Sequence, residues 1–415
     1  MSSVRNYIIP NLLTIPMALH WILPWGMEQQ LYAGSFFMPD LLIFYYIFKR
    51  LTRPNNRHSI GQHRKVALFI VCTAIILYVA ILSVLKNINY TFPILIGNLS
   101  FVWYTVIYMF FPLNSEQIKY TKPVFIASLL ILIGEVILYS SGILVYKTGA
   151  GNTLTGQDYN GFMRISTTVG AATGTALCIA IIGAITITLF SWKQWQRWTL
   201  IVMSALGIFF TMSRGASLIW VLFVIWLFYR DYYKKAKLSV KIKSLIAFVI
   251  FTIVFYSAGA MDPLLDRNSQ LLHSSSYTAG RSDKAVYSQR MIEIYAPWGS
   301  GPAQILPEKA IEKDYDPPHH FAPHNVYFLI MIELGYPGII LFIALFLLLF
   351  SGLDYRRNLS WFLLLVFSIG FNTESVVLDA EFASLILFGV MASSRYIKFS
   401  KKITSSNYVK CPIYN

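Results

Sequence analysis

Apolar runs of about 20 residues recur along this 415-residue chain, and they limit the folds that it can adopt. A membrane-spanning helix needs about 20 mainly apolar residues, and fewer where neighbouring helices shield it. Only 13% of the residues are charged, whereas a soluble domain carries about 25%. The expected fold class is an all-α integral membrane protein of about twelve transmembrane helices, near 8–25, 31–48, 66–86, 92–112, 123–146, 171–190, 199–212, 215–229, 244–260, 325–350, 359–376 and 381–394.

The basic residues between these runs predict the orientation of the helices. Lys and Arg gather in residues 49–65, 230–243, 354–357 and 395–402, and all four segments fall on one side when the helices are counted alternately. Cytoplasmic loops collect Lys and Arg, so both termini are expected in the cytoplasm. The net charge of +15 then reflects contact with a lipid bilayer, and nucleic acid is not needed as a partner.

The sequence predicts a single polytopic membrane domain over residues 1–415. No repeat of 20 to 50 residues and no low-complexity tract interrupts it. One large outward-facing loop, residues 261–324, holds a cluster of polar residues and is the expected catalytic subregion. The three cysteines, Cys72, Cys178 and Cys411, show no CxxC spacing, so neither a disulfide framework nor a metal site is predicted.

Three arginines stand where the outer membrane boundary is expected. Arg214 lies between two apolar runs in TMSRGASLIW. Arg281 and Arg290 flank an expected short amphipathic helix, whose apolar face includes Tyr287 and which ends before Pro297. Such arginines bind an anionic group or are merely snorkelling and solvated, and the pattern leaves both readings open.

His324 opens the helix that begins with Asn325. Histidine titrates near neutrality, and a neutral imidazole at a helix N-terminus suits a general base. A solvated loop is the bland alternative. A metal held by His319, His320 and His324 is another, although no carboxylate or cysteine stands at a ligand spacing. Residues 147–170 form a second outward loop with Arg164 near its end, which is either a binding loop or a linker.

Three motifs together resemble the O-antigen ligase and O-antigen polymerase superfamily of bacterial envelope proteins. They are TMSRGA at 211–216, GR at 280–281 with a second arginine and PWGSG at 297–301, and HNVYFLIMIELGYPGI at 324–339. Each motif is short and permissive. Their joint order and spacing carry the resemblance.

The resemblance implies a GT-C-like fold and a metal-independent, inverting glycosyltransferase without a cofactor. The implied donor is a glycan on undecaprenyl diphosphate at the outer face of the bacterial cytoplasmic (inner) membrane. The implied acceptor is a second lipid-linked repeat unit for a polymerase or lipid A-core for a ligase, with a slight preference for the polymerase. His324 corresponds to the catalytic base, and Arg214, Arg281 and Arg290 to the diphosphate-binding residues. Arg164 matches loosely, and His319 and His320 leave open which histidine acts.

Two other classes of function stay open at this stage. A transporter or flippase for a charged lipid or solute would use ionisable groups within the membrane, such as Asp40 and Glu135. A structural scaffold would leave His324 and Arg290 replaceable. The clustering of arginines at the outer boundary favours glycan transfer over both.

Overall fold

The computed structural model describes residues 32–33, 36–37, 62–86, 99–110, 113, 115–143, 157–159, 162–164, 172–211, 213–231, 233, 281–302, 325–373 and 380–395. Within these ranges the chain is almost entirely helical, and the two antiparallel hairpins are of two- and three-residue strands. The expected spans 8–25 and 244–260 lie outside the described residues, as do His319, His320 and His324.

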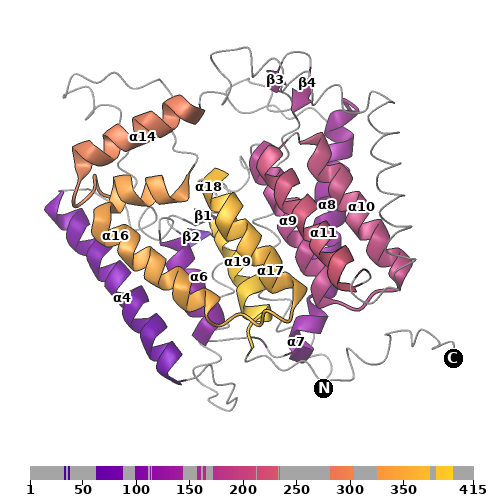
Figure 1. The fold of residues 1–415 in the computed structure, drawn as a ribbon, viewed down its shortest axis with the longest axis horizontal. Helices are drawn as coiled ribbons and strands as arrows, with labels where there is room; N and C mark the ends of the chain where they lie inside the picture. Colours follow the sequence, from indigo (N-terminus) through magenta and orange to yellow (C-terminus); the bar gives the residue numbers. More distant parts are fainter. Residues whose placement is uncertain are drawn as a thin grey trace.

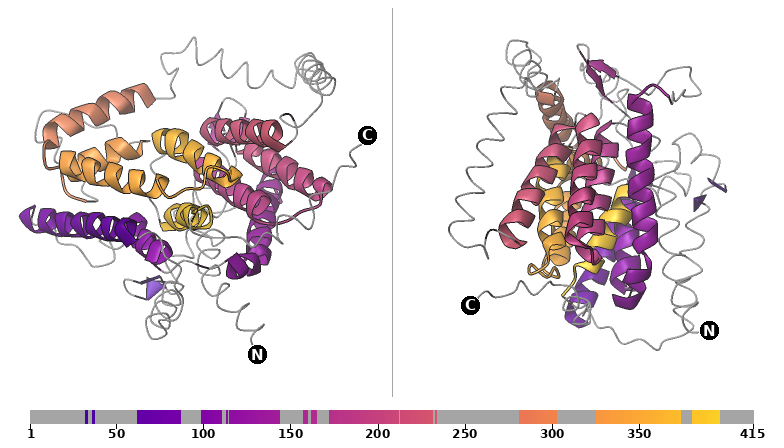
Figure 2. Two further views of the ribbon diagram at one scale, coloured as in Figure 1. Left: turned by 60° about the horizontal axis from the view of Figure 1, so that its bottom comes forward. Right: turned by 90° about the vertical axis from the view of Figure 1, so that its right-hand side faces the viewer.

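The described helices gather in one bundle, most of them side by side, as the right-hand view of Figure 2 shows. They are α4 (Gln62–Leu85), α6 (Ser100–Phe110), α7 (Ser115–Tyr120), α8 (Lys122–Ser140), α9 (Ala172–Leu189), α10 (Gln194–Phe210), α11 (Arg214–Asp231), α14 (Arg281–Tyr295), α16 (Val326–Phe350), α17 (Asn358–Leu365), the π-helical turn η2 (Val366–Gly370), α18 (Phe371–Thr373) and α19 (Ala380–Ala392) (Figure 1). The strands are β1 (Tyr32–Ala33), β2 (Phe36–Phe37), β3 (Gln157–Tyr159) and β4 (Phe162–Arg164).

Four helical stretches in the described part of the chain are long and apolar enough to cross a membrane. They are His63–Leu85, Ser115–Ser140, Ala172–Leu189 and Val326–Phe350. Shorter apolar helices cover Phe101–Phe110, Asn358–Gly370 and Phe382–Ala392. These elements agree with an all-helical membrane protein.

Helix α9 lies at the centre of the bundle, where it packs against α8, α10, α11, α17 and α19. Its side chains are small or β-branched, and nearly all of them are buried. The buried Thr186 hydroxyl is satisfied within the helix, because it donates to the Ile182 carbonyl at 2.7 Å. A helix that is apolar all round is typical of a position enclosed by other helices.

A cluster of phenylalanines joins α6, α16 and the η2–α18 segment. The ring of Phe101 lies 5.4 Å from that of Phe346, and the Phe346 ring lies 5.2 Å from that of Phe371. Phe367 completes the cluster at 4.7 Å from Phe371. These separations suit edge-to-face packing, which adds to the area that the rings bury. The cluster fixes the C-terminal half of α16 against α6 and the η2–α18 segment.

One end of the bundle, called here the basic end, is defined by polar bonds between helix starts and helix ends. Arg64, near the start of α4, donates to the Leu348 and Leu349 carbonyls of α16 at 2.9 and 3.1 Å. Arg197 of α10 pairs with Asp231 of α11 at 2.7 Å. The cations at this end are Arg64, Lys65, Lys119, Lys122, Lys193, Arg197, Arg230, Arg356, Arg357 and Arg395, against the acids Glu116, Asp231 and Asp354 among the described residues.

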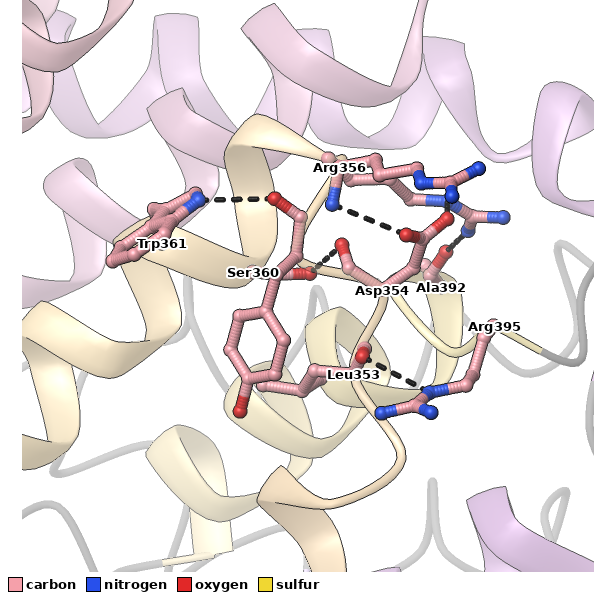
Figure 3. A network of polar contacts seen from close by, with 9 residues as sticks. Leu353, Asp354, Arg356, Ser360, Trp361, Ala392 and Arg395 are labelled. Atoms are coloured by element: carbon pink, nitrogen blue, oxygen red, sulfur yellow. Dashed lines mark hydrogen bonds and ion pairs between the residues drawn. The ribbon is translucent and has the colours of Figure 1, made fainter.

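The connection between α16 and α17 is held at the basic end by a compact network (Figure 3). The Ser360 hydroxyl donates to the Asp354 carbonyl at 2.7 Å, and Arg395 Nε donates to the Leu353 carbonyl at 3.4 Å. Arg357 Nη1 donates to the Ala392 carbonyl at 2.5 Å, which ties the start of α17 to the end of α19. Burial lowers the pKa of the Arg357 guanidinium, while the neighbouring Asp354 carboxylate opposes that shift.

The opposite end, called here the site end, therefore holds the starts of α9, α11, α16 and α19. Helix α14 and the β3–β4 hairpin also lie at this end, at the top of Figure 1. The four basic segments of the sequence thus share one end wherever the structure describes them, and the segments predicted to face outward share the other.

Two sequence predictions need correction. The span expected at 31–48 cannot begin as a helix, because Tyr32–Ala33 and Phe36–Phe37 pair as antiparallel strands. The Gly34-Ser35 dipeptide between them is typical of a tight hairpin turn. The span expected at 359–376 is not a uniform α-helix either, since residues 366–370 form a π-helical turn. Such turns arise where an extra residue is inserted into the helical ladder.

Candidate active site

Segment 297–301 of the PWGSG motif is bonded through its main chain to a break in α16, and this arrangement is called here the clasp. The amides of Ser300 and Gly301 donate to the Ile332 and Glu333 carbonyls at 2.8 and 2.9 Å. The Tyr336 amide donates in return to the Pro297 carbonyl at 2.9 Å. The two motifs that the sequence shows about 30 residues apart therefore form one structural unit.

The break in α16 follows from two residues of ELGYPG. Gly335 has φ 65° and ψ −164°, which no helical residue adopts. Pro337 has no amide hydrogen, so the carbonyl four residues earlier, that of Glu333, loses its helical donor. Buried carbonyls need a partner, and the clasp supplies one from outside the helix. The hydroxyl of Ser300 adds a second bond to the Ile332 carbonyl at 3.2 Å.

A third carbonyl at the break is bonded by a side chain from another helix. The Tyr78 hydroxyl of α4 lies 2.8 Å from the Leu334 carbonyl and 3.0 Å from the Trp298 carbonyl. Its one hydrogen is shared between two acceptors, one on each side of the clasp. Tyr78 could not be predicted from the sequence, because an apolar helix with one tyrosine carries no signal of such a contact.

Helix α14 packs against the first part of α16, and both figures of the fold show the two side by side. Tyr287, Met291 and Ile292 form a small apolar cluster with Ile332. Phe328 packs at its edge. The helix expected between Arg281 and Pro297 is confirmed, and Tyr287 lies on its packed face with 5% of the side chain exposed.

The two arginines of α14 do not share a face of the helix. Nine residues separate Arg281 from Arg290, which is about 2.5 turns and sets them on opposite sides. Arg290 lies on the exposed face with Val286 and Glu293. Arg281 is the first residue of the helix.

Arg214 is the first residue of α11 and is exposed at the site end. The turn before it is tightly held, because the Thr211 hydroxyl donates to the Ile208 carbonyl at 2.6 Å and Ser213 is buried. Arg164 ends β4, where its register partner is Gln157.

Asn325 caps α16 at the site end. Its Oδ1 accepts hydrogen bonds from the amides of Tyr327 and Phe328 at 2.8 and 3.2 Å, as an N-cap does. Its Nδ2 donates to Asn372 Oδ1 at 3.1 Å, which ties the start of α16 to α18. His324, the preceding residue in the sequence, lies outside the described residues.

The structure thus brings four of the predicted elements to one end of the bundle: the Arg214 turn, the arginine-bearing α14, the clasp and the Asn325 cap. It adds Tyr78, Ser300 and Asn372 as residues that hold these elements. Among the described residues no group of three or more His, Cys, Asp and Glu side chains could hold a metal ion.

Residues 198–343 match the family model described as O-antigen ligase. The match covers about a third of the chain. The matched segment runs from within α10 to within α16, so it contains the Arg214 turn, α14, the clasp and the Asn325 cap. Tyr78 and Asn372 lie outside it. No curated protein matches the chain. The long apolar helices and the match to the O-antigen ligase model both agree with a membrane protein.

Proposed function

We propose that the chain transfers a glycan from undecaprenyl diphosphate to a sugar hydroxyl, with inversion at the anomeric carbon. The observation that carries the proposal is the clasp. It bonds the end of the arginine-bearing α14 to the helix whose capped start adjoins His324. The match to the O-antigen ligase model supports a lipid-linked glycan as substrate.

The reaction needs a cation for the leaving group and a base for the acceptor. As the acceptor oxygen attacks the anomeric carbon, the bond from that carbon to the diphosphate oxygen breaks and negative charge develops on the diphosphate. Arginine forks bind phosphate oxygens in pairs and neutralise that charge without a metal ion. We assign this role to Arg214, Arg281 and Arg290. Arg164 is a further candidate.

His324 takes the proton of the acceptor hydroxyl. A positioned base of this kind typically contributes about 10²–10⁴-fold to the rate. The Asn325 cap satisfies two amides at the start of α16, while the positive end of the helix dipole disfavours a charged imidazole beside it. The neutral, proton-accepting form of His324 is thereby favoured.

We further propose that the site end faces outward and the basic end faces the cytoplasm. The clustering of Lys and Arg at one end of the bundle supports this orientation under the positive-inside rule. The same proposal includes the predicted twelve spans in a GT-C-like bundle, with cytoplasmic termini, in a bacterial inner membrane.

Transfer from a purified undecaprenyl-diphosphate oligosaccharide tests the proposal. The full chain, in lipid nanodiscs with EDTA, is given lipid A-core or a second lipid-linked repeat unit as acceptor, and the anomeric configuration of the product is read by NMR. Product on the repeat unit identifies a polymerase, and product on lipid A-core identifies a ligase. A retained configuration would contradict inversion.

Matched variants test the residues. We expect His324→Ala to lower the rate at least 100-fold, and His319→Ala and His320→Ala to leave it within about threefold. Arg290→Ala is compared with Arg356→Ala, an exposed arginine at the basic end. Equal rates for those two would exclude Arg290 from the site. Movement of a lipid or solute across liposomes without any glycan transfer would replace this proposal with a transporter.

A further inference from the structure

Tyr78 lies outside the segment that matches the O-antigen ligase model, yet its hydroxyl contacts the clasp. It lies on α4, 220 residues from Trp298 and 256 residues from Leu334. The family match starts at residue 198, well after α4. Its hydroxyl is within hydrogen-bonding distance of two carbonyls, that of Trp298 in the segment after α14 and that of Leu334 in α16, and these two segments are called here the arms of the clasp.

Each of those two carbonyls belongs to a segment that leads to a proposed functional group. Trp298 follows α14, which carries Arg290 eight residues earlier. Leu334 precedes the break in α16, and nine residues separate it from the Asn325 cap. The Tyr78 hydroxyl is therefore shared between the arm that bears the arginines and the arm that begins beside His324.

The geometry of α16 makes this contact a sensitive one. The segment from Asn325 to Leu334 is about 13 Å long at 1.5 Å per residue. Because the helical ladder is interrupted at Gly335 and Pro337, this segment is held by the clasp and by its neighbours. A rotation of about 4° at the break would displace its start by about 1 Å. A displacement of that size at a reacting group can lower a rate about 100-fold.

We propose that Tyr78 is a positioning residue, whose hydroxyl sets the arginine-bearing α14 and the Asn325-capped start of α16 in register. This inference rests on the proposed glycan transfer for its effect on rate, while the contact itself rests on the geometry alone. The residue touches neither substrate nor the reacting atoms and acts through the two carbonyls.

The test uses Tyr78→Phe in the full chain, which removes one oxygen and keeps the ring. The matched control is Tyr355→Phe, because the Tyr355 hydroxyl likewise donates to a backbone carbonyl, that of Phe350 at 3.0 Å, but at the basic end. Hydrogen exchange is followed at the clasp amides of Ser300, Gly301 and Tyr336. Turnover and the KM for the lipid-linked donor are measured on monodisperse protein.

We expect Tyr78→Phe to speed exchange at the three clasp amides about tenfold or more. We expect kcat to fall about tenfold, with the donor KM within about twofold, because the arginines remain present but out of register with the base. A merely structural role would lower the yield of folded protein and leave kcat per folded molecule unchanged. Tyr355→Phe should alter neither the exchange at the clasp amides nor kcat.

A second variant at position 78 tests whether a restored donor rescues the clasp. Incorporation of p-aminophenylalanine at position 78 restores an N–H donor on the same ring and should return exchange and kcat towards the wild type, and it replaces Tyr78→Phe as the test if that variant does not fold. Unchanged clasp exchange and unchanged kcat in Tyr78→Phe would overturn the proposal, as would a failure of the amino analogue to rescue. If the wild type transfers no glycan, the proposed function fails, and the exchange measurement still decides whether Tyr78 holds the clasp.

Discussion

Gly299 and Gly335 meet backbone to backbone, at a distance that leaves no room for a side chain on either residue. A Cβ on Gly299 would overlap the Glu333 carbonyl, and a Cβ on Gly335 would overlap the Pro297 carbonyl. Both residues also have positive φ, 88° and 65°. The glycines of the PWGSG and ELGYPG motifs are therefore required by each other, which neither motif reveals alone.

Gly335→Ala is expected to dislodge the clasp. An L-residue in the left-handed region costs about 1–2 kcal/mol before any steric overlap is counted. The overlapped atoms are backbone and cannot rotate away, so the total loss of unfolding free energy should exceed about 2 kcal/mol. Thermal unfolding in detergent measures the change.

Gly134→Ala is the control for that variant. Gly134 lies within α8, and a Cβ there meets nothing within 4 Å. Alanine in a helix is favoured over glycine by up to about 1 kcal/mol, so the midpoint of thermal unfolding should stay unchanged or rise. An equal fall in both variants would show that the clasp is not the cause.

Asn325→Ala is expected to lower the free energy of unfolding by about 1 kcal/mol, because two amides at the start of α16 lose their acceptor. Asn325→Asp keeps an acceptor and adds a charge that suits a helix N-terminus, so it should lose less. Asn372→Ala removes the Asn325–Asn372 bond and leaves the cap intact. A higher unfolding midpoint for Asn325→Asp than for Asn325→Ala would support the cap, and a lower one would contradict it.

The bundle could be predicted from the sequence because its elements depend on local patterns. The turn at TMSRGA separates α10, which ends at Phe210, from α11, which begins at Arg214, close to the predicted boundaries. Helix α14 was expected from an apolar face and the stop at Pro297, and it ends at Tyr295. Helix α16 begins within one residue of its predicted start.

The site could be predicted only as separate pieces. The three motifs were found. The sequence could not show that amides of PWGSG bond the carbonyls of α16 that lose their helical donors at the break around Gly335 and Pro337. Such bonds join residues about 30 positions apart, and hydrophobic periodicity carries no record of them. The contact from Tyr78 spans still more of the chain. The π-helical turn at 366–370 was missed for a related reason, since its residues are as apolar as those of an ordinary helix.

Arg64→Met is expected to weaken the basic end. Two donors of the guanidinium bond the Leu348 and Leu349 carbonyls at the C-terminus of α16, where a cation also suits the helix dipole. Bonds from a charged donor contribute about 1.5–3 kcal/mol, so the unfolding midpoint should fall by several degrees. Lys65→Met is the control for removal of a neighbouring charge. A midpoint in Arg64→Met equal to that of Lys65→Met would show that the two carbonyl bonds contribute nothing measurable.

The orientation of the bundle is tested by cysteine labelling in intact cells. Val286 on α14 is 60% exposed at the site end, and Arg356 is exposed at the basic end, so a single cysteine at either position is accessible to solvent. Cys72 and Cys178 are buried and Cys411 is replaced by serine to remove background. A membrane-impermeant maleimide should label Val286→Cys in intact spheroplasts and Arg356→Cys only after permeabilisation, because the end rich in Lys and Arg is expected in the cytoplasm. The opposite pattern would place the arginines of α14 on the cytoplasmic side, where an outward-facing lipid-linked glycan could not reach them.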